Sequence, residues 1–446
     1  MIPIVTPAEM RALDAAAPEP VEVLVARAGA AVARAAVELL GGCYGRRVLV
    51  VAGKGNNGAD GREAARRLRR VGVRVTVVPA EDPRHGVGSC DLVIDAAYGT
   101  GFRGSWRPPD PGSAPVLAVD IPSGVDGLTG EAGGTILPAR RTVTFAALKP
   151  GLVLGRGREL AGAVTLADIG LDTVGTARAA LVEDTDVAAW LPERPREAHK
   201  WQTVVWVVAG SPGMTGAAHL ASRSAQRAGA GYVRLSIPGA AVGEGGPLEA
   251  VGTTLPAEGW ADAMLGDLDR FHALVVGPGL GRDATTTREV RRLVERSTIP
   301  MVVDGDGLAA LGEHPAGLAP STVLTPHDGE YTRLTGHPPD ADRLGAARWL
   351  AAASGATVLL KGSTTVTARP GGDVLLTTTG SPRLATAGTG DVLSGVIAAL
   401  LAGGLEPARA AAAGAHLHGR AAGLGWSRGL VAGDLVDLLP SAIAQL

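Results

Sequence analysis

Residues 48–61 spell VLVVAGKGNNGADG, an apolar run that leads through a glycine-rich turn into a polar helix. This order of strand, glycine loop and helix is the opening unit of nucleotide-binding α/β folds. The polar segment 56–72 has a suitable length to cross a parallel sheet and lead into the next apolar run at 73–80. The stretch therefore predicts an α/β domain built on a parallel sheet.

Both halves of the chain repeat this alternation of short apolar runs, glycine turns and alanine-rich helical segments. Continuous apolar runs are expected of strands that are covered on both faces. A seam without a strand pattern, 171–200, separates the halves, and a boundary near Val174 gives domains 1–174 and 175–446. We expect two three-layer α/β domains with parallel or mostly parallel sheets. The predicted strands lie within 46–53, 73–80, 91–97, 115–123 and 140–147 of the first half and 203–210, 232–238, 272–279, 300–308, 321–326 and 356–362 of the second.

The bulk composition limits the classes of function. The chain has 446 residues, 46% hydrophobic and 19% charged, as in soluble globular proteins. A net charge of −2 and an aromatic content of 3% argue against nucleic-acid binding. Cys43 and Cys90 form no CxxC motif, which favours a reducing compartment over a disulfide or zinc-thiolate scaffold. Because the start does not have the pattern of a signal peptide and the longest apolar run, 392–404, is too short to span a bilayer, we expect a cytoplasmic protein without membrane segments.

The glycines of the opening stretch follow a dinucleotide-binding spacing. Gly53, Gly55 and Gly58 are arranged as G-x-G-x-x-G, and the acidic residues Glu81 and Asp82 follow the next predicted strand. In this context the loop amides would face a pyrophosphate at the helix N-terminus. The alternative is a glycine turn that serves only the close packing of strand and helix. The spacing alone does not decide between the two.

Side-chain oxygens in and around this loop complicate a simple phosphate site. Asp60 would repel a phosphate, and Asn56 and Asn57 stand close to it in the sequence. Further oxygens end other predicted strands, and the carboxyl ends of parallel strands meet at one edge of a sheet. Such amide, carboxylate and hydroxyl oxygens suit a hard cation better than zinc. Each aspartate alone is more readily explained as a turn or cap residue, but several oxygens at successive strand ends favour a cation site. The residues at the strand ends are Asp95, Asp120 and Ser123. Arg103, in the loop YGTGFRG, adds a side chain that is able to hold a phosphate.

Four segments of the first half carry a family resemblance. The motifs GKGNNGADG, DAAYGTGFRG, VDIPSGVDG and FAALKPGL follow one another between residues 53 and 152. They resemble the N-terminal epimerase domain, with its Rossmann-like sheet, of the bifunctional NAD(P)H-hydrate repair enzymes, and the likeness covers residues 1 to about 170. The resemblance implies a potassium ion held by Asn57, Asp95 and Ser123. It also implies that the hydrated dinucleotide is contacted by Asn56, Asn57, Gly58, Ala59, Asp60, Gly99, Thr100, Gly101, Phe102, Arg103, Gly104, Ser105 and Asp120.

Two questions about this half stay open. Ala59 replaces the second glycine of the family's usual N-N-G-G-D, and its methyl group is tolerated at a negative φ but crowds the ligand at a positive one. Inversion at a carbon that bears a hydroxyl next to the ring nitrogen of reduced nicotinamide needs groups that move protons. Asp120 is the first candidate for this acid/base work and Lys149 the second, with ion support and a surface turn as their alternative roles.

The second half has a phosphate-handling pattern of another type. It contains no G-x-x-x-x-G-K-[ST] loop, which excludes a P-loop enzyme. The segment 387–391, AGTGD, places Gly388, Gly390 and Asp391 at the start of an apolar helix, where backbone amides form an anion hole. Asp391 lies where an acceptor hydroxyl would sit and can take its proton during phosphoryl transfer. The alternative is an aspartate N-cap; loops such as GPGLG, TPHDGE and KGSTT after other strands favour the kinase-like role.

The motifs of this half also occur in a family's order. AHKW, AGSPGMTGAA, GPGLG, TPHDGE, KGSTT and AGTGDVLSG resemble the ribokinase-like superfamily, and within it the ADP-dependent NAD(P)H-hydrate dehydratases. The resemblance implies that the hydrate is contacted by Ala217, Gly279, His327 and Asp391. It also implies that the adenine nucleotide, accompanied by Mg²⁺, is bound by Lys361, Gly362, Ser363, Thr364, Thr365 and Gly390. His416 and His418 are two apart on a predicted helix and so point to different faces, which favours structural roles over a metal pair.

These expectations combine into one function. The first domain is expected to interconvert the R and S hydrates of NADH and NADPH, and the second to dehydrate the S hydrate. There Asp391 would deprotonate the ring hydroxyl, ADP would phosphorylate it, and loss of phosphate would restore the double bond and leave AMP. The rivals are a small-molecule (vitamin) kinase with a dinucleotide-sensing first domain, and a non-catalytic binding protein. We also expect a homo-oligomer.

Overall fold

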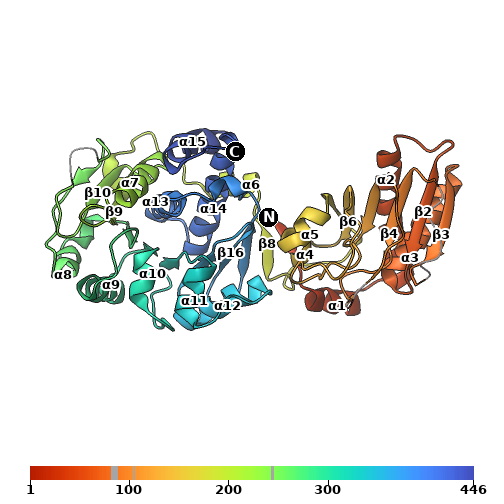
Figure 1. Cartoon of the computed structure of the whole chain (residues 1–446), viewed down its shortest axis with the longest axis horizontal. Helices are drawn as coiled ribbons and strands as arrows, with labels where there is room; N and C mark the ends of the chain where they lie inside the picture. Colours follow the sequence, from red (N-terminus) through yellow and green to blue (C-terminus); the bar gives the residue numbers. More distant parts are fainter. Residues whose placement is uncertain (82–88, 103, 105, 243–245) are drawn as a thin grey trace. The chain divides into compact units, whose positions relative to one another are not determined.

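The computed structural model describes residues 1–81, 89–102, 104, 106–242 and 246–446 (Figure 1). The chain divides into two compact units, each with its own sheet. The first unit comprises Ile2–Ala179, and the second comprises Ala180–Leu446 together with Met1.

The first unit contains a six-stranded sheet in the order β3-β2-β4-β5-β6-β7, with every neighbouring pair parallel. All five strands predicted in this half are confirmed, and β7 completes the sheet. The strands of this sheet are β2 (Arg47–Ala52), β3 (Arg74–Pro79), β4 (Leu92–Ala96), β5 (Val116–Val119), β6 (Arg141–Phe145) and β7 (Ala163–Ala167); the short strand β1 (Ile2–Ile4) is not part of it. The helices are α1 (Pro7–Ala15), α2 (Val21–Leu40), α3 (Asn56–Arg70), α4 (Pro150–Val153) and α5 (Gly155–Leu160).

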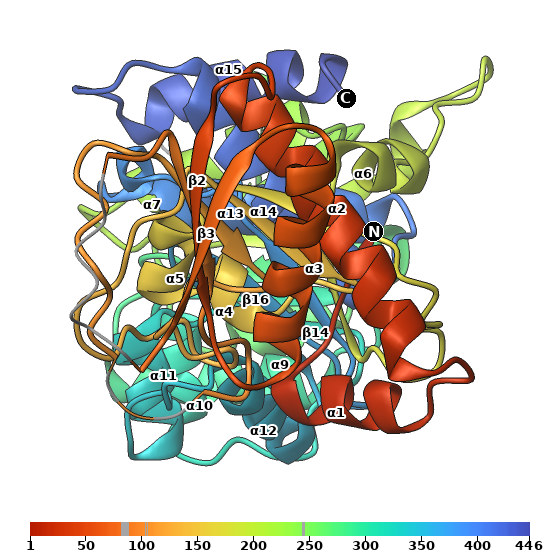
Figure 2. The ribbon, with the colours of Figure 1, turned by 90° about the vertical axis from the view of Figure 1, so that its right-hand side faces the viewer.

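Apolar residues cover both faces of this sheet, which explains why its strands are continuous apolar runs. Val50 and Ile94 are fully buried and belong to the core that packs against α2 and α3. Figure 2 shows these two helices side by side next to β2 and β3. Leu49 points to the opposite face, where Trp106 and Leu137 from the irregular segment between β4 and β6 cover the sheet. Both faces are therefore dry, and the open edge at the strand ends is left for ligands.

The second unit is built on a larger sheet in the order β8-β17-β16-β15-β14-β13-β12-β9-β10-β11. The pairs from β15 to β11 are parallel, and β16 and β17 are antiparallel, so the predicted mostly parallel sheet is confirmed. The strands are β8 (Ala179–Leu181), β9 (Val204–Val208), β10 (Tyr232–Ser236), β11 (Val251–Gly252), β12 (Ala273–Val276), β13 (Met301–Val303), β14 (Thr322–Leu324), β15 (Thr357–Leu360), β16 (Thr365–Ala368) and β17 (Val374–Thr377).

Helices flank this sheet on two sides (Figure 1), with α7, α13, α14 and α15 on one side and α8 to α12 on the other. Helices α13 and α7 pack closely because Gly395 has no side chain: a Cβ there would lie 2.1 Å from the carbonyl oxygen of Ala221. The helices are α6 (Asp184–Trp190), α7 (Gly216–Arg227), α8 (Trp260–Leu265), α9 (Ala284–Arg296), α10 (Asp306–Leu311), α11 (Asp328–Thr335), α12 (Arg343–Ser354), α13 (Thr389–Ala402), α14 (Pro407–Leu424) and α15 (Ala432–Ala444), with short 3₁₀ turns at Lys200–Gln202, Leu268–Arg270 and Pro382–Leu384.

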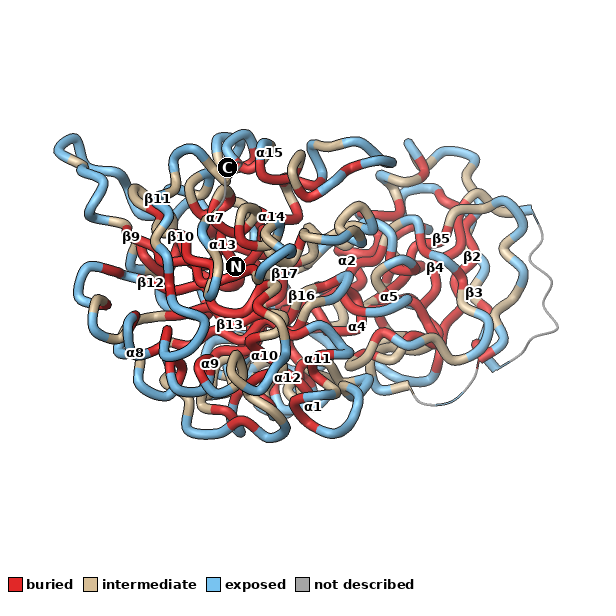
Figure 3. Tube along the Cα trace, turned by 60° about the vertical axis from the view of Figure 1, so that its left-hand side comes forward, coloured by how far each residue is buried: buried red, intermediate tan, exposed pale blue. Residues whose placement is uncertain are grey.

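The prediction of a seam without strands is wrong at one place. Strand β8 and helix α6 form within 171–200, and β8 pairs with β17 in the second sheet. A three-residue strand is too short to give an apolar pattern, so the sequence carries no signal for it. Figure 3 shows the strands as the buried interior of each unit. Within the described part of the chain, every helix falls short of the length or apolar content that a bilayer crossing requires.

Candidate active sites

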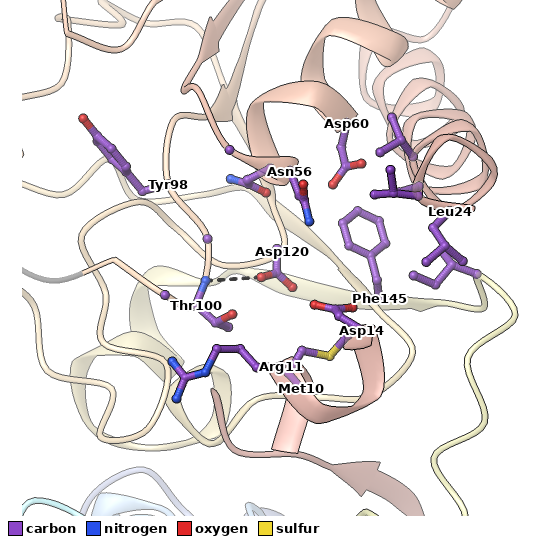
Figure 4. A pocket seen from close by; sticks show the side chains of 18 of the residues that line it. Met10, Arg11, Asp14, Leu24, Asn56, Asp60, Tyr98, Thr100, Asp120 and Phe145 are labelled. Carbon is purple, nitrogen blue, oxygen red and sulfur yellow. Dashed lines mark hydrogen bonds between the residues drawn. The ribbon is translucent and has the colours of Figure 1, made fainter. Parts of the chain in front are cut away.

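The carboxyl edge of the first unit's sheet borders a cavity of about 670 Å³. Its wall comes from helices α1 and α2, the start of α3 and the segments that follow β3, β4, β5 and β6 (Figure 4). Among the predicted dinucleotide contacts, Gly58, Ala59 and Gly104 are not part of this wall, while Arg103 and Ser105 lie outside the described residues, as does Asp82. The predicted residues that line the cavity are Asn56, Asn57, Asp60, Gly99, Thr100, Gly101, Phe102 and Asp120, together with Lys149 and Glu81.

Two glycines of the G-x-G-x-x-G loop are needed for packing. A Cβ on Gly53 would lie 2.0 Å from the carbonyl oxygen of Ala97, and one on Gly58 would lie 1.9 Å from that of Gly53. Gly55, the N-cap of α3, has nothing within 4 Å of its Cβ position and lines the cavity. Ala59 lies in the first turn of α3, where its N–H donates to the carbonyl of Gly55 at 3.1 Å. Helical backbone has negative φ, so the methyl group of Ala59 meets no backbone strain.

Asp120 directly follows β5 and has a φ of 68°, in the left-handed region that a β-carbon disfavours. Its carboxylate lies 2.6 Å from Nζ of Lys149, which is 1% exposed. The same carboxylate accepts hydrogen bonds from Oγ1 of Thr144 at 3.2 Å and from the N–H of Thr100 at 3.4 Å. Strained backbone of this kind concentrates at functional sites. The fold thus holds Asp120 at the cavity wall at a cost in backbone strain and anchors it with a buried lysine.

Asp60 and Asp14 are among the further carboxyl groups that line the same cavity (Figure 4). Asp60 is 7% exposed, and burial, then the charges of Asp120 and Asp14, raise its pKa to about 8. Asp14 comes from α1, and its pKa is also raised, first by partial burial and then by Asp120. Sequence reasoning missed Asp14, since α1 precedes every motif and its aspartate is unremarkable in an amphipathic helix.

Of the residues assigned to potassium, Asp95 and Ser123 form a buried hydrogen-bonded pair. Asp95, at the end of β4, is fully buried and accepts hydrogen bonds from the N–H and Oγ of Ser123 at 2.9 and 2.6 Å. Burial raises the pKa of Asp95, while these hydrogen bonds act in the opposite direction. Both polar atoms of the Asn57 side chain are buried and have no hydrogen-bond partner among the described residues. An unpartnered buried amide oxygen and a buried carboxylate are both oxygen donors of the kind that a hard cation binds.

In the second unit, Asp391 lies in the first turn of α13. Gly388 is the N-cap of this helix, with a φ of 87°, so the alternative in which Asp391 is the N-cap is wrong. Burial and the charge of Asp304 raise the pKa of Asp391 to about 6, against the attraction of Lys361. A carboxylate with this pKa is mostly ionised at neutral pH and is well matched to general-base work there.

Asp304 connects Asp391's helix to the rest of the sheet edge. It follows β13, is 3% exposed, and lies 2.9 Å from Nζ of Lys361. Its second oxygen accepts a hydrogen bond from Oγ of Ser394 on α13 at 2.8 Å. Nζ of Lys361 also lies 3.6 Å from the carboxylate of Glu330 on α11. Burial acts to lower the pKa of Lys361, but the carboxylates of Asp304 and Glu330 act in the opposite direction, and the net effect is a raised pKa. Sequence reasoning missed Asp304, although its place after an apolar strand is the signal that singled out Asp95.

The other residues predicted for this site lie in its loops. A Cβ on Gly279 would be 3.2 Å from that of Ala217, so these two predicted hydrate contacts are adjacent. A Cβ on Gly390 would lie 3.6 Å from both Asp304 and Nζ of Lys361. His327 is the N-cap of α11, where its Nδ1 accepts hydrogen bonds from the N–H groups of Gly329 and Glu330, and its Nε2 lies 3.5 Å from the Glu330 carboxylate. The predicted nucleotide segment, Gly362, Ser363, Thr364 and Thr365, directly follows Lys361 and leads into β16.

His416 and His418 have separate structural partners. Nε2 of His416 lies 2.7 Å from Asp184, while Nε2 of His418 lies 2.9 Å from the carbonyl oxygen of Thr389. Burial lowers the pKa of His418 to about 4, so it is neutral and donates to the start of α13. The two rings thus secure different contacts, as their spacing predicts.

Together these features define a class of enzyme with two sites. One unit offers proton-transfer groups in a cavity, and the other offers a carboxylate at a helix start suited to phosphoryl transfer. Comparisons with known proteins narrow this class. A family model described as NAD(P)H-hydrate dehydratase matches residues 205–444, and one described as YjeF-related protein N-terminus matches 21–90 and 81–151.

Relatives cover both units. The chain is 37% identical to the bifunctional NAD(P)H-hydrate repair enzyme Nnr of Moorella thermoacetica, covering 99% of this chain and 97% of the relative. It is 42% identical to the enzyme of that name from Mycobacterium tuberculosis, covering 83% and 82%. An ADP/ATP-dependent NAD(P)H-hydrate dehydratase from Bacillus subtilis, co-crystallised with ATP and Mg²⁺, is 31% identical with a TM-score of 0.50 and covers 59% of this chain and 97% of its own. The chain belongs to the family of bifunctional NAD(P)H-hydrate repair enzymes.

Proposed function

We propose that this protein restores hydrated NADH and NADPH, with one activity in each unit. The first unit epimerises the R and S hydrates, and the second dehydrates the S hydrate at the expense of ADP. The observation that carries the proposal is the likeness to bifunctional repair enzymes across 99% of the chain, combined with a carboxylate site in each unit. A vitamin kinase with a sensory first domain does not account for that full-length likeness.

Dehydration in the second unit begins at Asp391. Its carboxylate takes the proton of the ring hydroxyl, and the hydroxyl oxygen attacks the terminal phosphorus of ADP, releasing AMP. The phosphorylated hydrate then loses phosphate while the neighbouring ring carbon loses a proton, which restores the double bond. Phosphate leaves far more readily than hydroxide. The amides at the start of α13 and the ammonium of Lys361 would bind the phosphates, a role supported by the closeness of Lys361 to Gly390 in the first turn of that helix.

Epimerisation in the first unit relies on the groups around Asp120. Its carboxylate, held by Lys149, exchanges protons with the substrate hydroxyl or with water at the cavity wall. Asn57, Asp95 and Ser123 would hold K⁺, which supplies positive charge beside the buried Asp95. Mg²⁺ would accompany the nucleotide, as ATP and Mg²⁺ do in the Bacillus subtilis relative. The cytoplasmic location and homo-oligomeric state stay predictions.

The test uses the full chain with purified hydrates. With ADP present, the hydrate of NADH should recover absorbance near 340 nm, and with ADP absent a single epimer should give a mixture of R and S. Replacing K⁺ by Na⁺ or Li⁺ should slow the interconversion. Phosphorylation of an alcohol without recovery of NADH would contradict the proposal.

A further inference from the structure

The α1 wall of the first unit's cavity has no part in the function described so far. Helix α1 is fixed by a capping box between Thr6 and Glu9 and by the buried side chains of Met10 and Leu13. This anchoring sets the rotation of the helix so that Asp14 lines the cavity beside Asp120 and Phe145 (Figure 4). The helix lies ahead of the segment 21–151 that the N-terminal family model matches.

Asp60 is a buried carboxyl group on the cavity wall that could form a hydrogen bond with a polar ligand. Its side chain is 7% exposed, lines the cavity, and has no hydrogen-bond partner among the described residues. Its pKa of about 8 means that it carries a proton at neutral pH. A buried carboxyl group with a proton and no internal partner is available to donate that proton to a bound ligand.

Asp14 differs from Asp60 in its access to water. Asp14 is solvent-exposed, whereas Asp60 and Lys149 are buried. Electrostatic interaction joins Asp14 to Asp120, Asp60 and Lys149, since the charges of these groups act on one another's pKa. The charged groups on the cavity wall are Arg11, Asp14, Glu19, Lys54, Asp60, Glu81, Asp120 and Lys149.

Epimerisation requires two proton movements. When the carbon–oxygen bond breaks, the ring nitrogen's electron pair forms a carbon–nitrogen double bond, and an acid protonates the departing hydroxide to give water. A water molecule then adds to the other face of that carbon while a base takes its proton. The substrate is isomerised with no net change, but the acid has lost a proton and the base has gained one. A second turnover in the same direction needs that proton returned.

We infer that Asp14 is a proton-transfer residue of the epimerase site, returning protons between the buried Asp60, Asp120 and the water in the cavity. The inference rests on the proposed epimerase function. Of the three carboxyl groups, Asp14 is the exposed one, and it interacts with both of the others. Asp60 serves as the acid and Asp120 as the base for one direction, and their roles exchange for the other.

The test compares Asp14→Asn and Asp14→Glu in the full chain. Starting from one epimer without ADP, D14N should lower kcat for interconversion by roughly 10–100-fold with little change in KM, while D14E should restore most of the rate. Glu22→Gln, which removes an exposed carboxylate outside the cavity, is the matched control and should match the wild type. Dehydration of the S hydrate by the same D14N protein should be unchanged, which shows that the second unit is intact, and an unfolding transition of the first unit at the wild-type temperature shows that this unit is folded.

Two measurements separate proton transfer from a structural role. The rate should fall at alkaline pH as Asp60 loses its proton, and D14N should move this fall to lower pH because the negative charge that raises the pKa of Asp60 is gone. Formate should partly rescue Asp14→Ala. A D14N enzyme with the wild-type rate, or one with a lower rate but an unmoved alkaline limb and no rescue, overturns the inference. If the wild type itself fails to interconvert epimers, the epimerase function fails instead.

Discussion

The two units place an aspartate at a sheet edge but surround it with opposite arrangements of charge. In the first unit, Asp120 has its own buried lysine, Lys149, at 2.6 Å. In the second unit, Lys361 forms its ion pair with Asp304 at 2.9 Å. The pKa of Asp391 is raised to about 6, because burial and the charge of Asp304 outweigh the attraction of Lys361. The first arrangement holds Asp120 in an ion pair and shares proton uptake and release between Asp120 and the neighbouring carboxyl groups of Asp60 and Asp14. The second leaves one carboxylate free to take a single proton from a substrate hydroxyl.

The strongest test of this contrast is Asp391→Asn. We expect dehydration to fall by roughly 10³-fold, because the amide cannot accept the hydroxyl proton, while interconversion of the hydrates is unchanged. Recovery of absorbance near 340 nm measures the first activity, and separation of the epimers measures the second. Asp269→Asn, an exposed aspartate in the same unit, should behave as the wild type. Loss of both activities in D391N would mean that the two sites are not independent.

The complementary change is Lys149→Met. It should reduce interconversion by roughly 10²-fold and destabilise the first unit by about 3 kcal/mol, because the Asp120 carboxylate loses its buried partner. Epimer exchange and thermal unfolding check the two effects. Dehydration of the S hydrate in the same sample provides the control. A variant with normal exchange would show that the ion pair does not hold the reactive carboxylate.

The glycines of the loop before α3 and of the loop before α13 differ in how much space surrounds their Cβ positions. Gly58→Ala should destabilise the first unit by about 2–4 kcal/mol, because its Cβ would lie 1.9 Å from the carbonyl oxygen of Gly53. Gly55→Ala is the matched control, with nothing within 4 Å of its Cβ. Gly390→Ala makes only ordinary 3.6 Å contacts, so it should keep stability and weaken ADP binding where phosphate approaches the helix start. Equal unfolding midpoints for G58A and G55A would contradict this difference.

The smallest expected effect is a shift in pH dependence. Asp391 acts as an ionised base, so kcat/KM for dehydration should decline as pH falls below about 6. In Asp304→Asn the negative charge beside Asp391 disappears and Lys361 loses its main partner. Both changes lower the pKa of Asp391, so the acidic limb should move to lower pH. A limb that stays in place would show that another group controls it.

Much of the fold follows from local patterns in the sequence. The eleven segments predicted as strands each contain one, because buried parallel strands are continuous apolar runs bounded by turns. Six strands were not predicted: β1, β7, β8, β11, β16 and β17. They are two to five residues long, and β7 and β11 lie at sheet edges, so the pairing of these strands depends on neighbours distant in sequence rather than on their own apolar content.

The sites divide in the same way. The sequence by itself determined the motifs, the strand ends that carry Asp95 and Asp120, the helix start that carries Asp391, and the family they resemble, since these depend on residue type and spacing. Only the tertiary structure decided that Gly53 and Gly58 are required for close backbone packing. It also decided that Asp304 forms the ion pair with Lys361 and that Asp14 of α1 lines the cavity. The reason is that burial, strain and charge coupling arise between segments far apart along the chain, and no local pattern encodes how closely such segments approach.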